Sequence, residues 1–255
     1  MTDALRSGEY ARKQIYCPSR VVAWSHGSRF RLGGQLAASA GAGRRLLDYG
    51  CGDGTFIALT HGTFADAVGC DIDASQLAQC RRRLGDLDGV SFIHVDDVAG
   101  TGHTAAYDVV TCMEVLEHCV DAERTRVLDV LNRVVSPEGR VILSVPIEIG
   151  PALLAKQTFR AIAAWRGHGD YQHRETYSPL ELVAAGLARP RLARAEYNVQ
   201  TPTGPMRYCG HKGFDWRILE REIVQRFVVE DRRFTPLPAL GGLLNSQVWF
   251  VCRPK

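Results

Sequence analysis

The sequence has little of what marks a secreted or membrane-spanning protein. None of its eight cysteines forms a CxxC pair, and several lie in apolar runs, where a free thiol behaves as a small hydrophobic group. The first residues lack the apolar core of a secretory signal, and no stretch approaches the roughly 18 uncharged apolar residues that span a bilayer. We therefore expect a cytoplasmic protein with reduced thiols and no membrane span.

The sequence also lacks a strong excess of one charge. Its formal net charge is +3 over 255 residues, whereas nucleic-acid-binding proteins usually concentrate a larger basic excess on one face. Hydrophobic residues make up 45% and charged residues 23%, which is ordinary for a globular protein and excludes a disordered or fibrous one. These values argue against a nucleic-acid partner and leave a small-molecule substrate as the expectation.

From Arg44 onward, short apolar runs alternate with helical patterns, which is typical of βαβ units and a parallel sheet. Runs such as LLDYG and VVTCM are continuously apolar, as expected for strands covered on both faces. We predict strands at 45–49, 67–71, 91–95, 107–112, 140–145, 227–234 and 247–253, and helices at 55–61, 76–84, 121–134 and 214–226. The fold class is therefore α/β, a doubly wound, Rossmann-like, seven-stranded sheet, mostly parallel with an antiparallel last strand.

The flanking regions suggest two additions to this sheet. Residues 1–43 are expected to form a helical segment ending in the small-residue linker AASAGAG, and residues 44–255 form the main domain. The pattern becomes irregular at about 150–212, with a helical stretch at 152–165 followed by segments rich in turn-forming residues. Long irregular insertions in compact domains are commonly lids or binding loops, so we expect a substrate lid there.

The strongest local motif is LLDYGCGDGTF. A buried strand ends in an acid and runs through three glycines into a helix, which allows a tight turn and a close approach of backbone to a ligand. About twenty residues later a second strand ends in Asp71, where Rossmann-like sites place an acid that accepts both ribose hydroxyls. The turn contains Asp48, Gly50, Cys51, Gly52 and Gly54.

This glycine turn does not match a dinucleotide site. Such a site would have the pattern GxGxxG, with the pyrophosphate at the helix N-terminus, but here the third glycine comes one residue too early. The acidic Asp53 within the loop also suits a sulfonium cofactor better than a pyrophosphate.

The stretch from Arg45 to Pro146 resembles the class I S-adenosylmethionine (AdoMet)-dependent methyltransferase family, whose motif DxGxGxG binds the methionyl part of AdoMet. The resemblance implies AdoMet as cofactor, with Asp71 at the ribose and Ile72 beside the adenine. It places Asp96 at the adenine amino group, with Asp97 as a close competitor, and Met113 along the cofactor. The methionyl positions correspond to Asp48, Gly50, Gly52 and Gly54.

The sequence TCMEVLEHCVD follows the fourth predicted strand, at the carboxyl end where ligands bind in open α/β sheets. Methyl transfer is an in-line displacement, so the enzyme mainly aligns and desolvates the nucleophile. An alcohol or phenol must also lose its proton, which requires a general base or a metal ion. His118 is the best candidate base.

A metal-assisted reading of the same segment stays open. At helical spacing Glu114, Glu117 and His118 share a face, and they resemble the ExxEH arrangement that holds a divalent cation in small-RNA 2′-O-methyltransferases and in O-methyltransferases of ubiquinone biosynthesis. The RNA enzymes have a further histidine, for which we prefer His211 over His173. The sequence EVLEH also occurs in many methyltransferases with no known metal.

The sequence thus predicts an O-methyltransferase acting on a hydroxyl of a small or medium molecule, such as a sugar, a glycolipid headgroup or a phenol. Two alternatives remain: a metal-dependent RNA 2′-O-methyltransferase, and an AdoMet- or nucleotide-binding module without catalysis.

Overall fold

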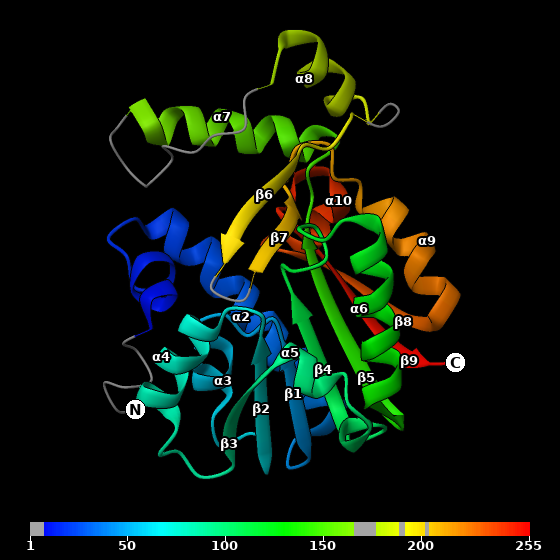
Figure 1. Ribbon diagram of the computed structural model, residues 1–255. Coiled ribbons are helices and arrows are strands. Elements are labelled where there is room, and N and C mark those ends of the chain that lie inside the picture. The colour runs from blue at the N-terminus through cyan, green and yellow to red at the C-terminus, as the bar shows by residue number, and fades with distance from the viewer. Residues whose placement is uncertain (1–7, 166–176, 189–191, 202–203) are drawn as a thin grey trace.

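A seven-stranded sheet forms the centre of the molecule in the computed structural model, which describes residues 8–165, 177–188, 192–201 and 204–255 (Figure 1). The strand order is β3-β2-β1-β4-β5-β9-β8, and the order reverses between β1 and β4. Ligands bind at such a switch point, outside the carboxyl ends of the strands. The parallel strands are β1 (Arg45–Tyr49), β2 (Asp66–Asp71), β3 (Val90–His94), β4 (Tyr107–Met113) and β5 (Val135–Pro146).

Two C-terminal strands complete the sheet. β9 (Gln247–Pro254) is antiparallel both to β5 and to β8 (Phe227–Thr235), so only β9 runs against the others. The predicted doubly wound sheet of seven strands, mostly parallel with an antiparallel last strand, is therefore confirmed.

Helices cover both faces of the sheet because successive side chains of a strand point to opposite sides. In β1, Leu46 belongs to one buried hydrophobic cluster and Leu47 to the other. The Leu46 cluster packs against α2 (Arg20–Gly41), α3 (Thr55–Thr60) and α4 (Ala74–Leu84). The Leu47 cluster packs against α5 (Val95–Val98), α6 (Asp121–Val134) and α9 (Trp216–Arg226).

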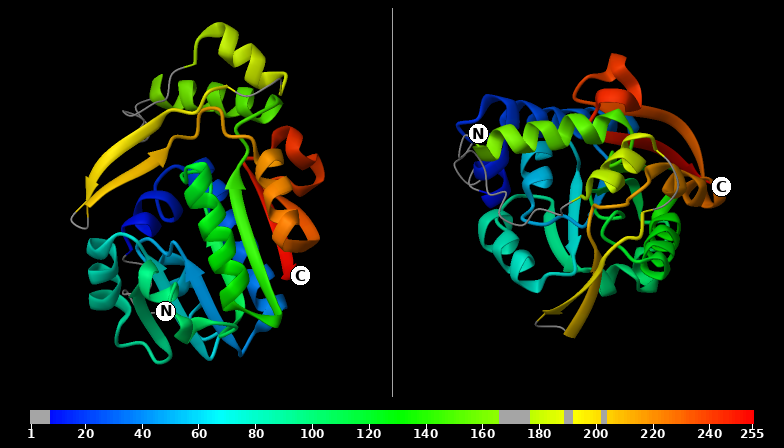
Figure 2. Two further views of the ribbon diagram at one scale, coloured as in Figure 1. Left: turned by 45° about the vertical axis from the view of Figure 1, so that its right-hand side comes forward. Right: turned by 90° about the horizontal axis from the view of Figure 1, so that it is seen from above.

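An insertion between β5 and α9 lies beyond the carboxyl end of β5 (Figures 1 and 2). It contains α7 (Pro151–Trp165), α8 (Pro179–Gly186) and a hairpin of β6 (Glu196–Thr201) with β7 (Gly204–Cys209). The hairpin was not predicted, because the turn-forming residues of this segment obscure the strand pattern. The insertion stands over the edge of the sheet where the candidate site lies.

Short elements complete the fold. These are the π-helical turn η1 (Ala11–Ile15), the 3₁₀ turns η2 (Thr101–His103) and η3 (Pro238–Leu240), and α10 (Gly241–Leu244). None of the helices in the described part of the chain is long and apolar enough to cross a membrane.

Candidate active site

The turn from β1 into α3 consists of backbone that other residue types adopt only with strain. Gly50, Gly52 and Gly54 have φ angles of 77°, 53° and 72°. A Cβ on Gly50 would lie 2.3 Å from Cγ2 of Val115, so a side chain is excluded by packing as well as by φ. The turn, with Cys51 buried within it, therefore presents bare backbone at the carboxyl end of β1.

Asp48 lies buried at the end of β1, just before this turn. The pKa of Asp48 is raised to about 7, chiefly by burial; a hydrogen bond from Thr111 opposes the rise, and the charge of the nearby Asp71 adds to it. In that bond the Thr111 hydroxyl donates to Oδ1 of Asp48 at 2.7 Å. A cationic group, such as the amino group of a methionyl ligand, would stabilise the charged form of this carboxyl.

Asp71, the last residue of β2, holds the glycine turn that follows β1. Its Oδ2 accepts the backbone N–H of Gly52 at 2.8 Å, and its Oδ1 accepts that of Asp73 at 2.9 Å. Each carboxylate oxygen has a second lone pair, so the group can still accept hydrogen bonds from ribose hydroxyls. Next to it Ile72 is 46% exposed, which leaves an apolar surface for a ring such as adenine.

The two acids after β3 have different roles in the fold. Asp97 caps α5, because its Oδ2 accepts the backbone N–H of His94 at 3.2 Å. The side chain of Asp96 is 88% exposed and lies 3.2 Å from Nδ1 of His94. Asp96 is thus the more accessible candidate for an adenine amino group. Met113, at the end of β4, lies against Gly33 of α2, where a Cβ would come within 3.3 Å of its Sδ.

The N-terminal segment contributes residues that the sequence did not single out. The backbone N–H of Tyr10 donates to Oδ2 of Asp53 in the glycine turn at 2.9 Å. Arg29, only 7% exposed, donates to the Tyr10 hydroxyl and lies 3.2 Å from Oε2 of Glu114. No local sequence signal marked this arginine, because its burial and its anionic partner appear only in the folded chain.

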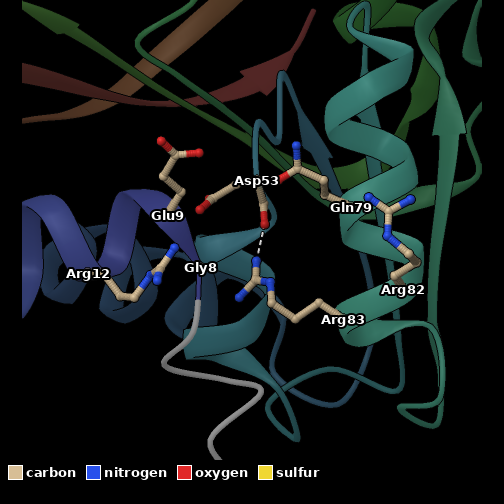
Figure 3. A pocket seen from close by; sticks show the side chains of 7 residues that line it. All are labelled: Gly8, Glu9, Arg12, Asp53, Gln79, Arg82 and Arg83. Carbon is tan, nitrogen blue, oxygen red and sulfur yellow. Dashed lines mark hydrogen bonds between the residues drawn. The ribbon is translucent and has the colours of Figure 1, made fainter.

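A small cavity of about 260 Å³ opens beside the glycine turn (Figure 3). It is bounded by the N-terminal segment, the turn and α4. The Arg83 guanidinium donates to the backbone carbonyl of Asp53 across its floor. The lining residues are Gly8, Glu9, Arg12, Asp53, Gln79, Arg82 and Arg83. The N-terminal segment therefore forms one wall around the loop that the sequence assigns to the cofactor.

The two predicted glutamates after β4 have different surroundings. Glu114, with φ of 57°, lies beside Arg29 and also accepts a hydrogen bond from the Ser144 hydroxyl at 3.4 Å. Glu117 is fully buried, and neither of its carboxylate oxygens has a hydrogen-bond partner among the described residues. Burial, and then the charge of Glu114, raise the pKa of Glu117 well above its usual value.

His118 is held in one tautomer by the backbone. Its Nδ1 lies 3.1 Å from the carbonyl oxygen of Cys209, and because a carbonyl only accepts, Nδ1 carries the proton. In the neutral ring Nε2 is then a bare acceptor, 3.8 Å from Oε1 of Glu117. The His118 side chain is 41% exposed, so a substrate can reach the imidazole.

His211 joins His118 although 93 positions separate them in the chain. The two rings lie edge to face, with centroids 4.7 Å apart and planes at 87°. The fold therefore brings together the two histidines that the sequence nominated. The alternative His173 lies outside the described residues.

The predicted metal ligands do not converge in the described part of the chain. No group of three or more His, Cys, Asp or Glu side chains is arranged there to hold a metal ion. The physical reason is that Glu114 faces the cation Arg29 instead of pointing to a common position with Glu117 and His118. As placed, the described side chains do not form a site for a divalent ion.

Comparison with known proteins identifies the family. Residues 47–141 match the family model described as a methyltransferase domain. The ubiquinone biosynthesis O-methyltransferase of Thiobacillus denitrificans is 31% identical over 168 residues, 63% of this chain and 71% of that protein. The chain belongs to the AdoMet-dependent methyltransferase family. The enzyme of the same name from Cronobacter sakazakii is 35% identical to this methyltransferase over 116 residues, which make up 46% of the Cronobacter enzyme.

Solved structures agree with this assignment at the level of the fold. The PH0226 protein of Pyrococcus horikoshii superposes over the whole of both chains with a TM-score of 0.60 and 17% identity. The N-methyltransferase NodS of Bradyrhizobium japonicum, in complex with S-adenosylhomocysteine, gives a TM-score of 0.55 over 99% of both chains with 12% identity. At these identities the likeness shows a shared fold and leaves the acceptor open.

The geometry of the turn suits the cofactor of this methyltransferase, which is AdoMet. Bare backbone at Gly50, the buried carboxyl of Asp48 and the remaining lone pairs of Asp71 provide space, charge and hydrogen-bond acceptors for it. All three lie at the carboxyl ends of β1 and β2, next to the switch point of the sheet.

Proposed function

We propose that this methyltransferase transfers the methyl group of AdoMet to a hydroxyl oxygen of a small or medium-sized acceptor. The observation that carries this proposal is the fixed tautomer of His118, whose Nδ1 donates to the Cys209 carbonyl and whose Nε2 is a bare acceptor. A hydroxyl needs such a base because it must lose its proton to become a good nucleophile.

The reaction follows from these positions. AdoMet supplies an electrophilic methyl group on a sulfonium centre. His118 takes the hydroxyl proton at Nε2 while the oxygen forms its bond to the methyl carbon and the carbon–sulfur bond breaks in line, leaving S-adenosylhomocysteine (AdoHcy). Oε1 of Glu117 lies 3.8 Å from the same nitrogen, and the imidazolium that forms there favours the ionised form of this buried carboxyl. The remaining task of the protein is alignment.

The cofactor contacts that we propose are those placed around the glycine turn. The methionyl part lies over Gly50, Cys51, Gly52 and Gly54, with its amino group toward Asp48. Asp71 accepts the ribose hydroxyls, Ile72 and Met113 flank the cofactor, and Asp96 or Asp97 meets the adenine amino group. Arg29, buried beside Glu114, supplies a cation for the methionyl carboxylate.

For the acceptor we propose a phenol or catechol ahead of a sugar or glycolipid headgroup. The support is that several relatives are named for O-methylation in ubiquinone biosynthesis. The same names favour a catalytic protein over a non-catalytic binding module, and a small acceptor over RNA. We further propose that residues around 150–212 act as the substrate lid, that the segment 1–43 packs over the cofactor turn, and that the enzyme works in the cytoplasm.

The experiment is a methyl-transfer assay with tritiated AdoMet and three acceptors: a catechol, a methyl glycoside and a short RNA. We expect label in the catechol, unchanged by a metal chelator. His118→Ala should abolish transfer while calorimetry shows unchanged AdoHcy affinity, and the exposed His61→Ala serves as the matched control. Normal turnover by His118→Ala, or a strict requirement for a divalent cation, would contradict the mechanism.

A further inference from the structure

Glu148 lies between a lysine and a histidine, two residues beyond the end of β5. Its side chain is 1% exposed, and its Oε1 is 2.9 Å from Nζ of Lys156 in α7. The same oxygen is 4.0 Å from Nδ1 of His211. A carboxylate so deeply buried requires cationic or N–H partners, because desolvation of an isolated charge is very costly. The sheet, the insertion and the loop after β7 therefore meet at this one group.

The loop that carries His211 is fixed independently of Glu148. The backbone N–H of Cys209 donates to the carbonyl of His118 at 2.7 Å. The Arg194 guanidinium donates to the carbonyl of Gly210 at 3.1 Å and also to that of Glu117. These bonds fix where the backbone of His211 lies but leave the rotation of its ring to side-chain partners. Glu148 is the carboxylate that faces Nδ1 of that ring.

Lys156 lies between Glu148 and the N-terminal helix α2. Besides pairing with Glu148, its charge contributes to lowering the pKa of His26 to about 4, after burial and Arg29. His26 belongs to α2, so Lys156 lies between the end of β5 and the N-terminal helix. Seen from above, α7 crosses over the molecule from the end of β5 toward the N-terminal segment (Figure 2).

We propose that Glu148 is a positioning residue that orients His211 beside His118, and that its ion pair with Lys156 couples the docking of α7 to that orientation. This inference rests on the proposed role of His118 as the base and deepens it. At 4.0 Å the carboxylate acts through its charge, which favours a proton on Nδ1 over one on Nε2. When α7 docks, both histidines then present unprotonated Nε2 atoms to the acceptor hydroxyl.

The test is nitrogen NMR of histidine-labelled full-length protein at one fixed pH, which reports the tautomer of each ring. His211→Asn identifies the signals of His211. Glu148→Gln should lose the Nδ1-protonated signature of His211, while AdoHcy affinity by calorimetry stays unchanged. The matched control is Glu181→Gln, which breaks another ion pair of the insertion, Glu181 to Lys212 at 2.9 Å, and should leave the spectrum unaltered.

A second variant covers the case in which Glu148→Gln does not fold. Lys156→Met removes the cation that compensates the buried carboxylate and ties α7 to it, so the Nδ1-protonated signature of His211 should weaken. An unchanged His211 spectrum in either folded variant overturns the proposal and leaves the ion pair a structural tether. Because the spectrum needs no acceptor, failure of the wild-type enzyme to methylate any hydroxyl compound counts against the proposed function alone.

Discussion

Single carboxyl groups decide how the cofactor turn is held and charged. Asp71 accepts two backbone N–H groups that shape the turn, whereas Asp48 is buried with one hydrogen bond from a threonine. Both acids lie at the ends of neighbouring strands, yet Asp71 accepts two hydrogen bonds and Asp48 one, so the cost of burying a charge is offset less at Asp48. The two residues therefore give different experimental signatures.

Asp71→Asn should weaken AdoHcy binding by roughly tenfold to a hundredfold, because a charged acceptor becomes a neutral amide at a hydrogen-bonded site. The asparagine keeps the size of the side chain and one acceptor for the turn. Calorimetric titration with AdoHcy measures the loss, and the exposed Asp88→Asn is the control. Equal affinities in the three proteins would show that the ribose lies elsewhere.

Asp48 should make the stability of the ligand-free enzyme fall with rising pH. The pKa of Asp48 in the folded state, about 7, lies above its unfolded value, so the folded state holds the proton to a higher pH. The free energy of unfolding therefore decreases as the pH rises from about 4 to 7. The fall is at most about 4 kcal/mol in the free energy of unfolding. Asp48→Asn should remove it, making the variant more stable than wild type at pH 8.

Urea unfolding at pH 5 and pH 8 measures this difference. The exposed Asp66→Asn, at the start of β2, is the control and should follow the wild type. Parallel stability curves for Asp48→Asn and the wild type would mean that another group compensates the charge of the Asp48 carboxyl.

At the scale of the elements, two ion pairs join α6 to α9, and they differ in how deeply they are buried. Arg124, 6% exposed, lies 2.6 and 2.8 Å from the two carboxylate oxygens of Glu222. Arg226 pairs with Asp129 across the same two helices, but the aspartate is 58% exposed. The first pair leaves a buried charge if broken, and the second is largely solvated.

Glu222→Gln should therefore lower the free energy of unfolding by about 2–4 kcal/mol, since among the described carboxylates Arg124 then keeps only the exposed Asp121 as partner. Asp129→Asn should cost at most about 1 kcal/mol. Thermal unfolding of both variants beside the wild type gives the comparison. A larger loss for Asp129→Asn would reverse the ranking by burial.

Much of the element pattern could be predicted from sequence because it depends on local signals. α6 was predicted at its observed bounds, and the strands around the glycine turn lie within a residue or so of prediction. The β6–β7 hairpin and the four-residue α5 were missed, because their residues carry no clear periodicity and their geometry is set by what they pack against.

At the scale of the whole molecule, a cofactor held by the contacts proposed above would join the N-terminal segment to the sheet. AdoHcy at about a hundred times its dissociation constant should raise the free energy of unfolding by about 2.7 kcal/mol. For a chain of this length the melting temperature should rise by roughly 5–10 °C. Scanning calorimetry measures the shift, and Asp71→Asn at the same concentration should show about half of it or less.

The sequence by itself determined the sheet, the glycine turn and the acid that ends β2, because each follows from a short run of residues with one physical solution. It also nominated His118 and His211. Only the tertiary structure decided which groups meet. Arg29 faces Glu114, Glu148 joins Lys156 to His211, and the histidine rings touch across 93 positions. These contacts join residues far apart in the chain, so no local pattern encodes them.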